Sequence, residues 1–130
     1  MLIDALKFLR DQKPDIDTKA KNVQYLLMMA KVFLEQDTLT ADWRFKENVE
    51  AKSALFEARA IQTEVLELCR ELSTDRLDQE RFLAAEISYK IGKYLEERDG
   101  DLKDSIIAYH DCLQKKDDHK DALYALARLF

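Results

Sequence analysis

The sequence predicts an all-α protein of antiparallel helices joined by short polar turns. Only two glycines and one proline occur among 130 residues, of which 47% are apolar and 36% charged. Folds with many tight turns need far more glycine and proline, so β-sandwiches, barrels and glycine-rich nucleotide-binding folds are disfavoured. In addition, apolar residues recur at intervals of three and four along most of the chain, which is the spacing of an amphipathic helix.

Composition also narrows the classes of function. The net charge is −5, and no basic stripe is visible, so nucleic acid is not expected as the main partner. No run approaches the roughly 18 apolar residues of a membrane span. The apolar N-terminal segment is interrupted by Asp4, Lys7 and Arg10, which excludes a secretory signal. Cys69 and Cys112 are expected to be reduced thiols that pack as small apolar groups.

In the N-terminal part, two helices are expected. The first covers residues 1–12 and ends at Pro14, because proline disfavours helical backbone at the residue before it. The second begins after Asp15 or Asp17, both good N-cap residues, and runs to about Gln36. Its apolar stripe consists of Val23, Leu26, Leu27, Ala30, Phe33 and Leu34.

Further along, no residue between Ala41 and Leu72 breaks a helix. A seam with coiled-coil steps of four and three runs through this stretch: Ala54, Ala58, Ile61, Val65, Leu68 and Leu72. Its alanines favour close helix-on-helix packing, and a coiled-coil oligomer remains the alternative. The next helix is capped by residues 73–75 and reaches about Arg98. After a turn at residues 99–101, one helix runs to Lys115 and another ends the chain, which makes about six helices.

The last third of the chain repeats itself. Ile91 and Gly92 are followed by Leu95, and Leu126 and Ala127 are followed by Phe130, with an offset of 35 residues; Met29, Ala30 and Phe33 carry the same pattern. Between the two later copies, Gly100 precedes a small–aromatic–small series of Ser105, Tyr109 and Cys112. This pattern resembles the tetratricopeptide repeat, whose length is about 34 residues.

The resemblance implies a right-handed solenoid of stacked helical hairpins with irregular repeats. Gly92 and Ala127 would be the small residues at the helix contact, Ser105 and Cys112 the small residues of the second helix, and Gly100 the turn. The expected units are residues 1–14 as the end of a preceding repeat, 15–75 as an irregular repeat with an insertion near 37–52, 76–117 as a regular repeat, and 118–130 as the first helix of a following repeat. The chain is therefore expected to be a piece of a longer array.

Three segments, LLMMAKVF, ALFEARAIQTEVLE and FLAAEISYKIGKY, occur in this order within residues 22–130. Together they resemble the tetratricopeptide-repeat subunits of intraflagellar transport complex A. The resemblance implies a non-catalytic scaffold in retrograde ciliary transport trains, with other complex A subunits and ciliary cargo as partners. It also implies a location in the cilium or flagellum and at the basal body, on the cytoplasmic side. The alternative is a generic tetratricopeptide adaptor or co-chaperone that binds short peptides.

No catalytic, cofactor or metal site is expected, and neither enzymatic activity nor a small-molecule substrate. The chain lacks a P-loop, GxSxG and GxGxxG. His110 and His119 do not have the spacing of metal ligands and are expected to be solvated polar residues. The adjacent carboxylates of Glu96–Glu97 and Asp117–Asp118 are expected to cap helices or face water.

Candidate partner-binding residues come from two places. Trp43 and Phe45 lie in the predicted insertion beside Arg44, and tryptophan, aromatic residues and arginine are common anchors in interfaces; the alternative is that both pack on the chain's own helices. The candidates on the groove side of the solenoid are Tyr89, Lys93, Tyr124 and Arg128. A two-asparagine carboxylate clamp is not supported, because the only asparagines are Asn22 and Asn48.

Overall fold

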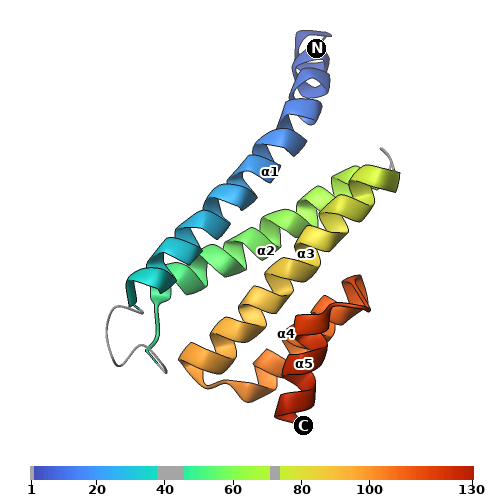
Figure 1. The fold of residues 1–130 in the computed structure, drawn as a ribbon. Coiled ribbons are helices and arrows are strands. Elements are labelled where there is room, and N and C mark those ends of the chain that lie inside the picture. The colour runs from blue at the N-terminus through green and yellow to red at the C-terminus, as the bar shows by residue number, and fades with distance from the viewer. Residues whose placement is uncertain (1, 38–45, 71–73) are drawn as a thin grey trace.

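The computed structural model describes residues 2–37, 46–70 and 74–130, and residues 2–15 by their backbone alone. The described part is all helical, as predicted, and contains five α-helices rather than about six (Figure 1). They are α1 (Leu2–Asp37), α2 (Val49–Cys69), α3 (Thr74–Tyr94), α4 (Leu102–Lys115) and α5 (Lys120–Leu129), with a π-helical turn, η1 (Leu95–Asp99), directly after α3.

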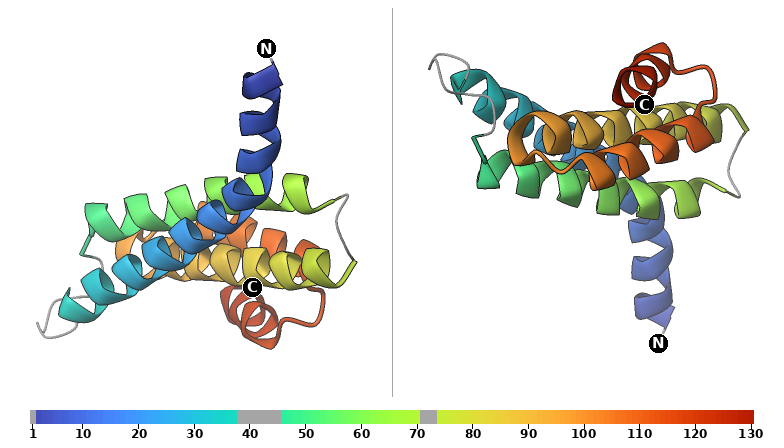
Figure 2. Two further views of the ribbon diagram at one scale, coloured as in Figure 1. Left: turned by 90° about the horizontal axis from the view of Figure 1, so that it is seen from above. Right: turned by 90° about the horizontal axis from the view of Figure 1, so that it is seen from below.

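The helix expected to end at Pro14 does not end there, because α1 continues through this residue to Asp37. Proline removes one backbone hydrogen bond and crowds the carbonyl four residues earlier, which bends a helix when neighbouring turns hold it together. In Figure 2 (left), the first turns of α1 leave the rest of the helix at a steep angle. The assignment of residues 1–14 to a preceding repeat stays a prediction.

The start of α2 is also later than expected. Residues 46–48 are not helical, and Asn48 is the N-cap: its side-chain oxygen accepts a hydrogen bond from the backbone N–H of Ala51 at 3.0 Å. Such a bond satisfies one of the donors that a helix start leaves without an intrahelical partner. The start of α2 is therefore marked by its capping residue, Asn48. The lack of a helix breaker from residue 41 onward does not mark it.

Each helix packs on the next one along the chain, so that α1–α2 and α3–α4 form two antiparallel hairpins and α5 packs on α4 (Figures 1 and 2). The larger core joins the two hairpins and contains Val23, Ala30, Ala54, Leu55, Ala58, Ile87, Ile91, Tyr94, Leu95 and Ala108. Two residues of the possible coiled-coil seam, Ala54 and Ala58, are thus buried against the chain's own helices. The arrangement is consistent with a helical repeat.

The predicted turn at residues 99–101 is present and depends on glycine. Gly100 has φ 66°, in the left-handed region that side chains disfavour. It allows the chain to reverse directly after η1, and Asp101 then caps α4 by accepting a hydrogen bond from the N–H of Asp104 at 3.1 Å. This tight connection brings α4 back along α3.

Candidate protein-binding groove

A groove of about 270 Å³ lies between α1 and α3, with α2 beneath it. Its apolar lining comes from Leu27, Ala30 and Leu34 of α1, Leu55 of α2 and Tyr94 of α3. Leu27, Ala30 and Leu34 follow helical spacing and therefore lie on one face of α1. The floor of the groove is formed by Ala30 and Leu55, which are both 2% exposed.

A second hollow of about 360 Å³ extends the same trench toward the N-terminal ends of α1 and α3. It is lined by Ala20, Lys21, Gln24, Tyr25, Met28, Glu80 and Leu83. Tyr25 and Met28 are both about two-thirds exposed, at 65%. Because residues 20–28 of α1 face residues 80–83 of α3, and residues 27–35 face 90–98, the two helices run in the same direction along the trench.

The rim of the groove is charged in a regular order. Lys31 on α1 and Lys93 on α3 are each followed four residues later by a glutamate, Glu35 and Glu97, and all four line the groove together with Lys90. In the described part of the chain, the side chains of Lys31, Lys90 and Lys93 take part in no hydrogen bond or ion pair. Three ammonium groups thus stand over an apolar floor without a partner from the described residues.

One end of the groove is lined by a buried arginine, Arg98. The side chain of Arg98 is 3% exposed and donates to Asp37 Oδ2 at 2.9 Å. It also donates to the carbonyl oxygens of Leu34 at 3.2 Å and Lys46 at 3.3 Å. The guanidinium therefore satisfies a carbonyl in the last turn of α1 and holds both ends of the connection between α1 and α2.

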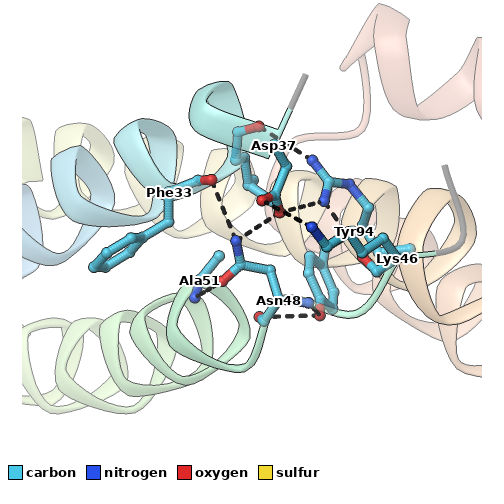
Figure 3. Close-up of polar contacts among 8 residues, drawn as sticks. Phe33, Asp37, Lys46, Asn48, Ala51 and Tyr94 are labelled. Atoms are coloured by element: carbon cyan, nitrogen blue, oxygen red, sulfur yellow. Dashed lines mark hydrogen bonds and ion pairs between the residues drawn. The ribbon is translucent and has the colours of Figure 1, made fainter. Parts of the chain in front are cut away.

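Asn48 and Tyr94 complete this cluster. The Asn48 side-chain amide donates to Asp37 Oδ2 at 2.8 Å and to the carbonyl of Phe33 at 3.2 Å, while Tyr94 accepts from the Asn48 N–H and donates to its carbonyl (Figure 3). The hydrogen bond from Asn48, followed by that from Arg98, lowers the pKa of Asp37. Burial raises the pKa of Tyr94, so its hydroxyl is held in the neutral form that both donates and accepts.

The two helices of the second hairpin meet at Gly92. A Cβ placed on Gly92 would lie 2.7 Å from Tyr109 Cε1, so this position accepts no side chain without movement of the ring. Ser105 donates to the Gly92 carbonyl at 2.8 Å, and Cys112 is fully buried on the same side of α4. Burial raises the pKa of the Cys112 thiol to about 12, so it is an inert apolar group.

The prediction that Glu96 caps a helix or faces water is wrong, because its carboxylate is a buried hydrogen-bond acceptor. Its side chain is 9% exposed and accepts from Tyr109 Oη at 2.8 Å and from Arg128 Nη2 at 2.9 Å. Burial raises the pKa of Glu96, yet the hydrogen bonds from Arg128 and Tyr109 outweigh it and leave the pKa below its usual value. Glu96 thereby links η1 to both α4 and α5.

The prediction that His119 is a solvated residue is wrong, because it is buried and forms the N-cap of α5. Its Nδ1 accepts from the N–H of Ala122 at 3.1 Å, and its Nε2 lies 2.6 Å from Glu86 Oε1. Since Nδ1 acts as an acceptor, the neutral ring carries its proton on Nε2 and donates it to Glu86. His110 is exposed, as expected.

The candidate partner-binding residues fall in different surroundings. Lys93 lines the groove, and Tyr124 is 74% exposed on α5. Arg128 is bound to Glu96, and Tyr89 packs its ring on Tyr109 and His119 with centroid distances of 5.7 and 5.1 Å. The structure thus brings only one of these four to the groove. Trp43 and Phe45 lie outside the described residues.

The residues assigned to repeat positions are mostly inside. Ala30, Ile91, Gly92, Leu95, Ser105, Tyr109, Cys112 and Leu126 are buried, Met29 and Phe33 are half-buried, and Ala127 and Phe130 are exposed. Of the two residues predicted to be the small residues at a helix contact, Gly92 is buried and Ala127 is exposed.

Sequence reasoning missed the cluster around Arg98 and the His119 cap. Asn48 directly before Val49 and Glu50 is a recognisable helix start, and its position would have placed the end of the α1–α2 connection. No comparable signal marks Arg98, whose partners Leu34, Asp37 and Lys46 are more than 50 residues away. Only the tertiary fold brings them together.

No family model, curated protein or solved structure matches the chain. Among the described residues, no group of three or more histidine, cysteine, aspartate or glutamate side chains has the geometry to hold a metal ion. Within the same residues, no helix has the length and apolar character needed to span a membrane.

Proposed function

We propose that this chain is a non-catalytic scaffold segment of the tetratricopeptide type, which binds protein partners in the groove between α1 and α3. The observation that carries the proposal is the groove itself, with an apolar floor made by three helices and a rim of lysines. A concave apolar surface with a few polar groups at its rim is the usual form of a binding site. Helical repeats provide such surfaces between neighbouring hairpins.

The finer part of the proposal comes from the resemblance of residues 22–130 to the tetratricopeptide-repeat subunits of intraflagellar transport complex A. On this basis the partners are other subunits of complex A and ciliary cargo, and the place of action is the cilium and basal body. The contact of Gly92 with Tyr109, beside Ser105 and Cys112, supports the repeat assignment because small and aromatic residues occupy the positions that the repeat requires.

The competing adaptor or co-chaperone function is less well supported. Clamping a terminal carboxylate with asparagines requires their amides to point into the groove. The Asn48 amide is already used by Asp37 and the Phe33 carbonyl, which leaves Asn22 as the other asparagine of the chain.

A steric test of the groove uses two matched tryptophan variants. Lys93→Trp places a bulky side chain at the groove rim, whereas Lys103→Trp places it on the exposed side of α4 outside the groove. Full-length chains are expressed in ciliated cells, and co-purified complex A subunits are quantified by mass spectrometry. We expect Lys93→Trp to lower their recovery several-fold and Lys103→Trp to leave it unchanged. Equal recovery with both variants would contradict binding in the groove, and recovery of no complex A subunit with the unmodified chain would contradict the complex A assignment.

A further inference from the structure

We infer that the groove selects one kind of partner: an amphipathic helix with acidic residues at one end and a basic residue about one turn beyond its acidic part. This inference rests on the proposed function and specifies the chemistry of the ligand. It is carried by the order of charges along the groove, which is the same on both walls.

The spacing of the apolar residues along α1 matches that of a helical ligand. Leu27 and Leu34, with Ala30 between them, are seven positions apart on α1, or about 10 Å along the helix axis. Two turns of a partner helix have the same length and present apolar anchors at positions i, i+3 or i+4, and i+7. The second hollow beside Tyr25 and Met28 extends the contact for a longer helix.

Lys31 and Glu35 line one wall of the groove, and Lys93 and Glu97 line the other. In each pair the glutamate follows the lysine by four residues, or about 6 Å along the axis. Because α1 and α3 run in the same direction, both lysines lie toward one end of the groove and both glutamates toward the other. Lys90 adds a third ammonium group at the lysine end.

The two lysines of these pairs are not bound to the glutamates that follow them. Within the described residues Lys31 and Lys93 form no ion pair, although residues four apart on a helix are neighbours. Lysine followed by glutamate at this spacing is also the less favourable order on a helix. Acidic side chains of a ligand therefore meet unpaired ammonium groups at the lysine end, and a basic side chain meets the carboxylate of Glu97 at the other.

The closed end of the groove agrees with this polarity. The positive charge of Arg98 is compensated by Asp37 at 2.9 Å, so it does not attract anionic ligand groups. The C-terminal ends of α1 and α3 also lie at this end, and helix C-termini carry partial negative charge. The electrostatic contrast between the two ends is therefore reinforced by the backbone.

The test uses three synthetic 18-residue helical peptides that share one leucine stripe. The bipolar peptide has glutamates in its first turns and lysines about one turn beyond the last glutamate, the neutral peptide has glutamines at these positions, and the basic peptide has lysines at all of them. Binding to the ¹⁵N-labelled full chain is followed by amide chemical shifts. We expect the bipolar peptide to bind most tightly, with shifts at Leu27 and Lys93, and its affinity to fall as salt rises.

A charge reversal in the chain makes the test specific. Lys90→Glu should weaken the bipolar peptide about threefold to tenfold, since partly exposed ion pairs contribute modestly, and should strengthen the basic peptide. Lys103→Glu, which changes the net charge equally outside the groove, should do neither. If the neutral peptide shifts the same groove amides and binds as tightly as the bipolar peptide, the inferred selection by charge is wrong, although binding in the groove is retained. If no peptide shifts these amides, the inference on ligand chemistry is overturned, and the co-purification of Lys93→Trp still decides the proposed function.

Discussion

Arg98 Nη1 lies 2.9 Å from Asp37 Oδ2, and this ion pair joins residues 61 positions apart in the chain. It connects η1, which directly follows α3, to the end of α1, and so fixes the relative position of the two walls of the groove. The closed end of the groove is therefore held in place by the buried polar cluster around Arg98 and Asp37.

Replacing Arg98 should cost more stability than replacing a surface partner. We expect Arg98→Met to lower the free energy of unfolding by about 3–5 kcal/mol, because it breaks the buried ion pair with Asp37 and removes the donor of the Leu34 and Lys46 carbonyl groups. Lys52→Met removes the Lys52–Asp99 pair, in which Lys52 is 35% exposed, and should cost less than about 1 kcal/mol. Urea denaturation followed by circular dichroism measures both, and equal losses would show that the cluster is not a tie between the hairpins.

Gly92→Ala should destabilise the chain, although alanine is the better helix former by about 1 kcal/mol. The new methyl group would lie 2.7 Å from the Tyr109 ring, and such overpacking costs about 1–3 kcal/mol. Thermal unfolding provides the measurement. In the Tyr109→Leu background the same change should be neutral or stabilising, and a stabilising effect in the unmodified chain would mean that the ring moves aside freely.

Stability should fall in acid because three carboxyl groups have lowered pKa values. The pKa of Asp37 is lowered by hydrogen bonds from Asn48 and Arg98, and those of Glu96 and Asp111 are lowered by their partners against the effect of burial. Such groups stabilise the fold at pH values above their unfolded-state pKa of about 4 and lose this contribution as the pH falls through the lower folded-state pKa. Unfolding free energies between pH 7 and pH 2 should decline less steeply for Asp37→Asn. Parallel curves for the variant and the unmodified chain would contradict this.

His119 should stabilise α5 through its cap. His119→Ala removes the acceptor for the Ala122 N–H and should cost about 1 kcal/mol, whereas His119→Asn should retain much of the cap. Amide hydrogen exchange in residues 120–129 reports the loss locally. His110→Ala, at an exposed histidine, is the matched control, and identical exchange in both alanine variants would argue against the cap.

The sequence predicts most of the helices but few of the contacts between them. The helices from Thr74 onward, and the turn at Gly100, follow from periodicity and from the positive φ that glycine allows. Pro14 predicts the end of a helix, yet α1 continues through it, since local rules do not include the turns that hold a helix together on both sides. The groove depends on pairs such as Leu34 with Arg98, whose sequence separation hides them from any local pattern.

Binding of complex A subunits in the groove between α1 and α3 can be tested by placing a photo-crosslinker there. Full-length chains carrying p-benzoylphenylalanine in place of Lys90, or in place of Lys103 as the control, are irradiated in ciliated cells, and the adducts are identified by mass spectrometry. If partners bind in the groove, adducts with complex A subunits should form from position 90 and few or none from position 103. Adducts from position 103 alone would contradict a partner in the groove between α1 and α3.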